Sequence, residues 1–228
     1  MAVNINTVYQ KVLAIANKEK RGYITPQEFN LFADQAQKEI FEQYFYDLNQ
    51  FKRIPGNNTV SSDPTDIIEE KISLFRKQSG SQNPLSDEVY RLESVRYKDS
   101  ITGTFYTAEE VSKKEHDALV LSKLTRPTIT RPIFYRLENE IYRFPDSGYN
   151  DTLLDYIKKP TTPSWAYNII NQKPFYNSTN SIDFELHHSD ESELVYRILF
   201  MAGVAIEKPQ LSQAAAALQT STIQQEKQ

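Results

Sequence analysis

The residues that could do chemistry gather between positions 158 and 195. This stretch holds the chain's only tryptophan, Trp165, the adjacent histidines His187 and His188, and the carboxylates of residues 190–193. Histidine and carboxylate side chains together can bind a metal ion or catalyse hydrolysis. Adjacent histidines, however, point to opposite faces of a strand and diverge by about 100° on a helix. They do not grip one metal ion easily, so we predict no metal site here.

A structural role explains the same residues more simply. Asp190-Glu191-Ser192-Glu193 has the pattern of a capping box, and the apolar run that follows predicts a helix over 194–203 that ends at Gly203. We expect the histidines to form a solvent-facing turn before this helix. Trp165 is expected to be a hydrophobic plug beneath it, with a stacking platform for a ligand as the alternative. His116 is expected to be an ordinary surface histidine.

The sequence carries no recognised catalytic motif. It contains no GxSxG, HExxH, GxxxxGK[ST] or GxGxxG, and it has no cysteine that could act as a nucleophile or zinc ligand. Paired carboxylates such as Glu109-Glu110 fall in the first turns of expected helices, where they complement the helix dipole. We therefore predict a protein that is not an enzyme and binds no cofactor. A hydrolase that uses His187 or His188 with Glu185 or Asp190 is the less favoured alternative.

Two helices are predicted in the N-terminal part. Apolar spacing indicates a first helix over 4–17, and Thr25-Pro26-Gln27-Glu28 is a capping box that begins a long second helix reaching about Leu48. The second helix carries a broad aromatic stripe, wider than one short helix can cover. Another helix or another subunit should cover the rest. The candidate contact residues on this stripe are Phe29, Phe32, Phe41 and Tyr44.

The middle of the chain changes to strand patterns. A short amphipathic helix over 65–77 is followed by alternating residues that predict strands, and a capping box at Thr107–Glu110 predicts a helix over 111–123. Residues 126–145 predict a hairpin that turns at Glu138-Asn139-Glu140, with aromatic residues meeting across the two strands. The expected strands cover 88–97, 100–107, 126–137, 140–145 and 153–160, and the expected aromatic pairs join Phe134 and Tyr135 to Tyr142 and Phe144.

These elements predict an α+β fold, in which the N-terminal and C-terminal parts form an antiparallel helical bundle and the centre forms a small antiparallel β-sheet domain. The expected parts are a helical region over 1–86, a mainly antiparallel β region with one helix over 87–186, and a C-terminal helix with a docking tail over 187–228. A chain of 228 residues is long enough to bury a core in such a fold without a metal or disulfide.

Composition narrows the classes of partner. The net charge of −4 and the absence of long basic runs argue against a dedicated nucleic-acid-binding surface, although local patches remain open. The 14 tyrosines and 12 phenylalanines suit either protein interfaces or a tyrosine-rich core. The polar N-terminus does not resemble a signal peptide, and no apolar run has spanning length. We expect a soluble, non-exported product without a membrane partner.

Three stretches carry a resemblance to a known family. They are RGYITPQEFNLFADQAQKEIFEQYFYDLNQF (21–51), IKKPTTPSWAYNIINQKPFYN (157–177) and IDFELHHSDESELVYRILFMAGVAIEKPQLSQAAAALQ (182–219). Together they resemble virion structural proteins of tailed bacteriophages, best represented among crAss-like phages of gut Bacteroidetes. Within those short-tailed virions the chain looks like an adaptor or ring protein of the head-to-tail connector. The resemblance covers the N-terminal helices and the C-terminal third; residues 53–150 contribute less to it.

The resemblance implies a virion protein, made in the host cytoplasm, that assembles as a homo-oligomeric ring of twelve copies around a DNA channel. It implies contacts with the portal protein or with other connector or tail ring proteins through extended terminal segments. DNA would pass through the channel without sequence-specific contact, which a modest negative charge suits. A transient assembly factor that binds the same partners and then leaves the particle is the alternative.

The C-terminal segment 209–228 is the expected docking tail. Its alanine run over 214–217 favours a helix but offers little apolar area, so the helix should be marginal unless it docks on another protein. The candidate contact residues in this segment are Pro209, Leu211 and Leu218, and Trp165 is the further candidate from the preceding region.

Overall fold

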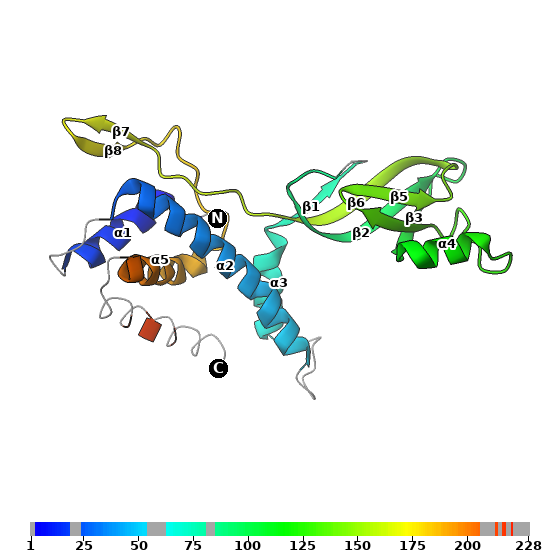
Figure 1. The fold of residues 1–228 in the computed structure, drawn as a ribbon, viewed down its shortest axis with the longest axis horizontal. Helices are drawn as coiled ribbons and strands as arrows, with labels where there is room; N and C mark the ends of the chain where they lie inside the picture. The colour runs from blue at the N-terminus through cyan, green and yellow to red at the C-terminus, as the bar shows by residue number, and fades with distance from the viewer. Residues whose placement is uncertain are drawn as a thin grey trace. The chain divides into compact units, whose positions relative to one another are not determined.

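The computed structural model describes residues 3–18, 24–53, 63–80, 85–205, 213, 216–217 and 220. The fold is α+β, as the sequence predicts, and it divides into two compact units. The helical unit combines residues 1–74 with residues 160–228, and the sheet unit is the continuous segment 75–159 (Figure 1). The sheet unit is thus an insertion in the chain of the helical unit.

This division differs from the predicted boundaries. Residues 160–186, predicted to belong to the β region, group with the helices, and residues 75–86, predicted to belong to the helical part, group with the sheet. Strand pairing explains the second change. Residues 76–79 form β1 (Arg76–Ser79), which pairs with β6 (Tyr149–Lys158) of the sheet unit. Sequence composition changes little at either point and gave no sign of the boundary.

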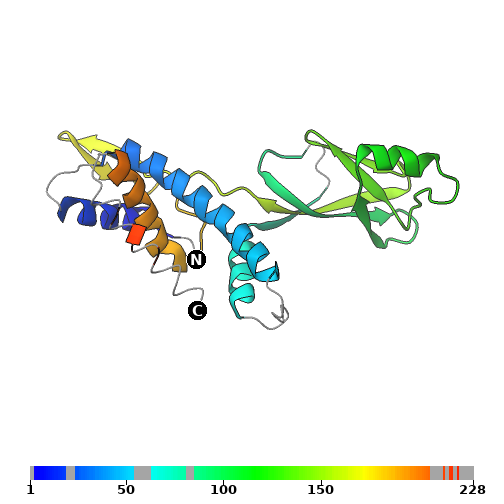
Figure 2. The ribbon, with the colours of Figure 1, turned by 60° about the horizontal axis from the view of Figure 1, so that its bottom comes forward.

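The helical unit is organised around α2 (Pro26–Arg53). Helix α2 packs against α3 (Asp63–Ser73) and α5 (Glu191–Ala205), and α5 also packs against α1 (Ile5–Lys18), as Figure 2 shows. The predicted capping box at the start of α2 is present: the Glu28 backbone N–H donates to Thr25 Oγ1 at 3.3 Å, and the Thr25 N–H donates to Glu28 Oε2 at 2.9 Å. The contacts of α2 with α3 and α5, and of α5 with α1, define a helical core made from the N-terminal and C-terminal parts of the chain.

Within the helical unit, the extended segment that begins at Pro160 runs along α2. Gln37 donates to the Thr161 carbonyl oxygen at 2.7 Å and accepts from the Glu185 N–H at 3.0 Å. Two turns earlier on α2, Asn30 accepts from the Trp165 N–H at 2.8 Å and donates to the Trp165 carbonyl oxygen at 3.3 Å. Buried amide side chains thereby satisfy backbone groups that no strand partner satisfies. Polar residues on α2 therefore hold the segment that follows the sheet unit.

The sheet unit contains six strands in the order β1-β6-β2-β3-β4-β5. The remaining strands are β2 (Val89–Asp99), β3 (Phe105–Glu110), β4 (Ile133–Leu137) and β5 (Glu140–Phe144). All neighbours are antiparallel except β3 and β4, which are parallel and are joined through α4 (Lys113–Leu121). A parallel pair needs such a crossover connection. The prediction of a purely antiparallel sheet is therefore wrong at β3 and β4, because these two strands are parallel.

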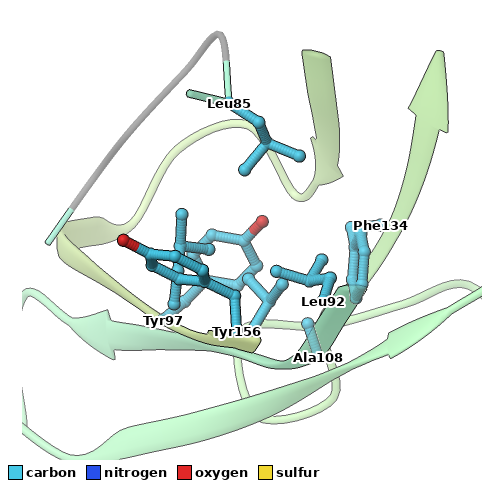
Figure 3. Close-up of a cluster of buried hydrophobic side chains, with 8 residues drawn as sticks. Leu85, Leu92, Tyr97, Ala108, Phe134 and Tyr156 are labelled. Atoms are coloured by element: carbon cyan, nitrogen blue, oxygen red, sulfur yellow. The ribbon is translucent and has the colours of Figure 1, made fainter. Parts of the chain in front are cut away.

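A tyrosine-rich core stabilises the sheet unit. Its buried residues come from four strands and one loop. Figure 3 shows Leu85 pointing toward the rings of Tyr97 and Tyr156. Leu92 lies between these rings and Phe134. The cluster comprises Leu85, Leu92, Val95, Tyr97, Ala108, Phe134, Leu154 and Tyr156. Many of the tyrosines that suited either an interface or a core are therefore core residues here.

Several local predictions need correction. The capping box at Thr107–Glu110 is wrong, because these residues continue β3; the helix begins after Ser112, which forms its own capping box with Glu115. Helix α3 ends at Ser73 instead of residue 77, and α5 continues through Gly203 to Ala205.

The hairpin of β4 and β5 forms as predicted, but only one of its aromatic pairs has the expected partner. Tyr135 faces Tyr142, with their rings stacked at 5.1 Å between centroids, whereas Phe134 faces Arg143 and Phe144 faces Ile133.

Candidate functional site

The histidine and carboxylate cluster is structural in most of its members. Asp190 was expected to cap a helix from an exposed turn, but it is 1% exposed and accepts from Lys71 Nζ at 2.7 Å. The Tyr44 hydroxyl donates to the other oxygen of the same carboxylate. Lys71 lies on α3, Tyr44 on α2 and Asp190 on the single-turn helix η1 (His188–Asp190). The three side chains therefore tie three elements together inside the helical unit.

The rings of His187 and His188 lie against each other, 4.3 Å apart between centroids and tilted by 55°, although adjacent histidines were expected to diverge. His187 is half-buried, precedes η1 and accepts from the Ser189 N–H through Nδ1 at 3.4 Å, whereas His188 is exposed. Glu185, the other acid considered for hydrolysis, accepts from both the backbone N–H and the hydroxyl of Thr161 at 2.8 and 3.0 Å. Within the part of the chain that the structure describes, no group of three or more histidine or carboxylate side chains is placed to hold a metal ion.

A hollow of about 270 Å³ lies beside the Lys71–Asp190 pair. Its apolar wall comes from α2 and α3 through Ile40, Phe51 and Ile67, and its polar lining includes Lys71 and Glu193. Its charged groups are engaged in contacts: Glu193 binds Arg197 Nη2 at 2.6 Å on the same helix, Lys71 binds Asp190, and Asp47 accepts from Gln43 Nε2 at 2.9 Å. The hollow is therefore lined by apolar side chains and by polar groups that bind one another.

His116 also departs from its expectation. Its ring lies on α4 and packs edge-on against Tyr135 at 4.7 Å and against Phe144 at 6.1 Å between centroids. The predicted surface histidine is therefore half-buried and helps to attach α4 to the β4–β5 hairpin.

The predicted contact residues of α2 lie mostly inside the helical unit. Phe29, Phe41 and Tyr44 are buried, and Phe32 is half-buried. The chain itself covers the stripe, through α1, α3 and α5. Of the two predicted ways to cover the rest of the stripe, another helix or another subunit, the structure shows helices from distant parts of the sequence. The other predicted contacts, Pro209, Leu211 and Leu218, lie outside the described residues.

Trp165 is buried, as the plug interpretation expects, but it lies elsewhere than predicted. It is 3% exposed, packs on Tyr9 of α1 at 4.2 Å between ring centroids, and donates from Nε1 to Asn6 Oδ1 at 3.1 Å. Its other face stacks on Tyr167 and Tyr176 at 5.7 and 5.8 Å. Trp165 therefore joins α1 to the strands β7 (Tyr167–Ile170) and β8 (Lys173–Tyr176).

The hairpin of β7 and β8 is the clearest candidate interaction surface. Its end exposes three large apolar side chains: Ile169 is 71% exposed, Ile170 53% and Phe175 51%. These three residues form what we call the hairpin surface. The pairing of Asn168 with Phe175 and of Ile170 with Lys173, together with strand alternation, places Ile170 and Phe175 on the face opposite the tyrosines that contact Trp165.

The hairpin is anchored at its base and free at its end. Asn171 and Gln172 both have positive φ values, 50° and 63°, which are the signs that a two-residue type I′ turn requires. Among the described residues, β7 and β8 make a sheet of only two strands, so both of its edges carry backbone groups without a strand partner. A second chain can pair with such an edge and cover the apolar side chains at the same time.

A groove lies between this hairpin and α1. It has a volume of about 730 Å³ and is lined by Gln10 and Leu13 of α1 and by Pro174 and Phe175 of β8, with Trp165 beside them. Apolar walls around a hollow next to an open strand edge favour docking of a peptide segment or of another protein. The arrangement therefore supports assembly and does not bring together groups for a reaction.

Two features were missed in the sequence, the buried Lys71 and the β7–β8 hairpin, and each has a weak signal there. Lys71 stands among apolar residues in IIEEKISLF, which is an unusual place for an exposed lysine. The hairpin has the sequence YNIINQKPFY, which lacks the Asn-Gly or Asp-Gly turn that is a strong signal of a β-hairpin.

Comparison of the chain with protein-family models and with curated proteins finds no match. No described helix is both long enough and apolar enough to cross a membrane.

Proposed function

We propose that this chain is a structural protein that assembles with copies of itself and with neighbouring virion proteins. The observation that carries the proposal is the hairpin surface. Ile169, Ile170 and Phe175 are exposed at the end of a hairpin whose base is fixed by Trp165. Exposed apolar side chains on a held, protruding element suit a protein partner, because contact with that partner removes them from water.

The form of assembly that we propose is the ring of a head-to-tail connector in a short-tailed phage. The sequence resemblance to virion proteins of crAss-like phages supports this form. A ring requires two different surfaces on each copy, one that reaches out and one that receives. The hairpin surface suits the first role. The dodecameric state, the contact with the portal and the passage of DNA through the ring belong to the same proposal.

The test compares two double variants by size-exclusion chromatography with light scattering. Ile170→Ser with Phe175→Ser removes apolar area from the hairpin surface. Leu31→Ser with Ile101→Ser removes exposed apolar area elsewhere, since these side chains are 71% and 87% exposed on α2 and in the turn after β2. We expect the wild-type chain and the control to form multimers, alone or on purified portal rings, and the hairpin variant to remain monomeric.

Assembly of the hairpin variant at wild-type strength would contradict the role of the hairpin. A wild-type chain that stays monomeric both alone and with portal rings would contradict the ring itself. Mass spectrometry of purified virions separates the remaining alternative, since a structural component stays in the mature particle and a transient assembly factor does not.

A further inference from the structure

A second surface, in the sheet unit, has a different chemistry. The segment SKLTRPTITRP, residues 122–132, connects α4 to β4, and we call it the basic loop. Residues 118–137 contain four lysine and arginine residues and no aspartate or glutamate. Lys123, Arg126 and Arg131 of the loop are all exposed. The weak net charge of the whole chain therefore hides a local concentration of positive charge.

Among the described residues, the cations of the basic loop lack acidic partners, unlike Arg96 and Arg136 of the same unit. Arg136 binds Glu110 at 2.8 Å, and Arg96 binds Asp155 at 2.8 Å. By contrast, Lys123, Arg126 and Arg131 form no ion pair with any carboxylate in the described part of the chain. Arg126 instead lies over the ring of Phe144, with its guanidinium carbon 5.5 Å from the ring centroid. Such stacking orients a guanidinium while leaving its N–H groups available.

A pocket of about 490 Å³ opens beside the basic loop. Arg126, Arg131 and the hydroxyl-bearing residues Thr125, Thr128 and Thr130 line it. Glu109 of β3 is the one carboxylate among the lining residues, and it leaves the lining with a net positive charge. Guanidinium groups and threonine hydroxyls are the donors that proteins direct at phosphate oxygens.

The basic loop is held in place by contacts on its inner side. The Tyr149 hydroxyl donates to the Ile129 carbonyl oxygen at 3.1 Å, and the Arg131 N–H donates to the Thr128 carbonyl oxygen at 3.0 Å. Gly148 has a φ of +101°, and a Cβ there would lie 2.9 Å from the Ile129 side chain. The loop thus packs closely on the segment before β6. A fixed loop loses less conformational entropy when a ligand binds it.

We propose that the basic loop and its pocket bind the phosphate backbone of a nucleic acid without reading its sequence. Cations at 123, 126 and 131 alternate with hydroxyls at 125, 128 and 130, which suits a chain of repeated phosphates better than a single anion. No asparagine or glutamine lines the pocket, so the side chains that read adenine are missing from its lining. Two or three phosphate contacts give weak, salt-sensitive binding.

Leu121 at the end of α4 and Leu124 of the basic loop are 84% and 95% exposed, which raises a membrane surface or an acidic protein as other partners. An interfacial membrane helix needs a long apolar face, whereas α4 is a helix of nine residues whose first five positions include four charged residues, two of them acidic. The unpaired arginines beside threonine hydroxyls favour phosphate. The inference is independent of the ring proposal, since it rests on the sheet unit and the hairpin surface lies in the helical unit.

The test measures binding of a short mixed-sequence duplex DNA by fluorescence anisotropy over a range of salt concentrations. The variant Arg126→Gln with Arg131→Gln removes two cations from the pocket. The control Arg91→Gln with Lys114→Gln removes the same charge from other exposed positions of the sheet unit. We expect the loop variant to lose affinity at low salt and its plot of log affinity against log salt to flatten by about two, roughly one for each lost contact.

The control should retain most of the affinity and nearly the wild-type salt dependence. Equal losses in both variants would overturn the proposal, because they would show attraction by net charge alone. Absence of DNA binding by the wild-type chain at low salt would overturn it as well. Binding to vesicles of anionic lipid, or to another protein, that depends on Arg126 and Arg131 while DNA binding does not would assign the loop to that partner instead. The readout is DNA affinity, so failure here leaves the light-scattering test of the hairpin surface unaffected.

Discussion

At the scale of single residues, the pair of Lys71 and Asp190 matters most for the helical unit. The side chains of these residues are 10% and 1% exposed, and their ionised groups lie 2.7 Å apart. A buried pair stabilises little relative to apolar residues, but loss of one partner leaves a buried charge uncompensated. Replacement of a single member should therefore be far more damaging than the worth of the pair suggests.

We predict that Lys71→Met lowers the free energy of unfolding by about 3–5 kcal/mol. The control is Lys11→Met, because the ion pair of Lys11 with Glu191 is exposed and should contribute about 1 kcal/mol or less. Urea unfolding followed by tryptophan fluorescence reports on this unit, since Trp165 is the chain's only tryptophan. Addition of Asp190→Asn to Lys71→Met should restore part of the loss. Equal effects of the two lysine variants would contradict this account.

A second residue-scale prediction concerns the core tyrosine of the sheet unit. Burial raises the pKa of Tyr97 to about 12 from the ordinary tyrosine value of 10.0. Below pH 10 the hydroxyl is neutral in both states. Between pH 10 and 12 it ionises in the unfolded chain but stays protonated in the folded chain, so the unfolded state binds fewer protons and stability falls as the pH rises.

We therefore expect the wild-type chain to lose up to about 3 kcal/mol over this interval relative to a Tyr97→Phe variant, which has no proton to lose. Urea unfolding followed by far-ultraviolet circular dichroism at several pH values between 8 and 12 measures the difference. If both proteins lost the same unfolding free energy between pH 10 and 12, a group other than Tyr97 would be responsible for the loss.

Sequence patterns found the residues of the candidate cluster but not their roles. Asp190 was assigned to a helix cap because its spacing to Glu193 matches a capping box, whereas its carboxylate turns inward to Lys71, a residue 119 positions away. Spacing along the chain carries no information on such a partner. The hairpin surface was missed for a related reason, because its turn residues, Asn171 and Gln172, are not the usual pair for a type I′ turn.

At the scale of elements, long periodic segments were predicted well and their ends less well. The first two helices and the strands of the β4–β5 hairpin follow directly from residue spacing. Helix α4 was also predicted, over 111–123, but its capping box was placed at Thr107–Glu110 because Thr107 and Glu110 have the spacing of such a box. Residues 107 and 108 instead pair with β2, which outweighs the local capping preference.

We predict that Ser112→Ala lowers the free energy of unfolding by about 1 kcal/mol and increases hydrogen exchange at the Glu115 amide. The Ser112 side chain accepts from that N–H at 3.2 Å, and the Glu115 carboxylate accepts from the Ser112 N–H at 2.9 Å. The matched control is Thr107→Val, which removes a hydroxyl but keeps the branched shape that suits a strand. It should leave exchange at Glu115 unchanged. A larger increase in hydrogen exchange at Glu115 in Thr107→Val than in Ser112→Ala would instead support the predicted cap at Thr107.

At the scale of the whole molecule, the fold class could be predicted from the sequence, whereas the division of the chain into two units could not. An α+β protein follows from the change between helical and strand periodicity. The grouping of residues 1–74 with 160–228 does not follow from periodicity. It depends on contacts such as the pairing of Val3 with Phe184, two residues that the whole sheet unit separates in sequence. No local pattern at either end announces that pairing.

The ends of the sheet unit lie together, and this leads to a prediction about folding. The Lys158 N–H donates to the Phe75 carbonyl oxygen at 2.8 Å, and the Lys159 N–H donates to the Glu88 carbonyl oxygen at 2.7 Å. The tyrosine-rich core draws all of its members from within residues 75–159. A segment with its own core and adjacent ends meets the usual requirements of an independently folding domain.

We predict that residues 75–159 fold alone, with a cooperative thermal transition in circular dichroism and a dispersed amide spectrum in nuclear magnetic resonance. The complementary variant joins Leu74 to Pro160 through a short glycine-serine linker, which adjacent ends allow. It should keep the buried fluorescence of Trp165, because the residues that its ring contacts, Asn6, Tyr9, Tyr167 and Tyr176, all belong to the helical unit. Failure of the isolated segment to fold while the linked variant does fold would show that the sheet unit needs the helices for its stability, whereas failure of both would show that the two units form one cooperative core.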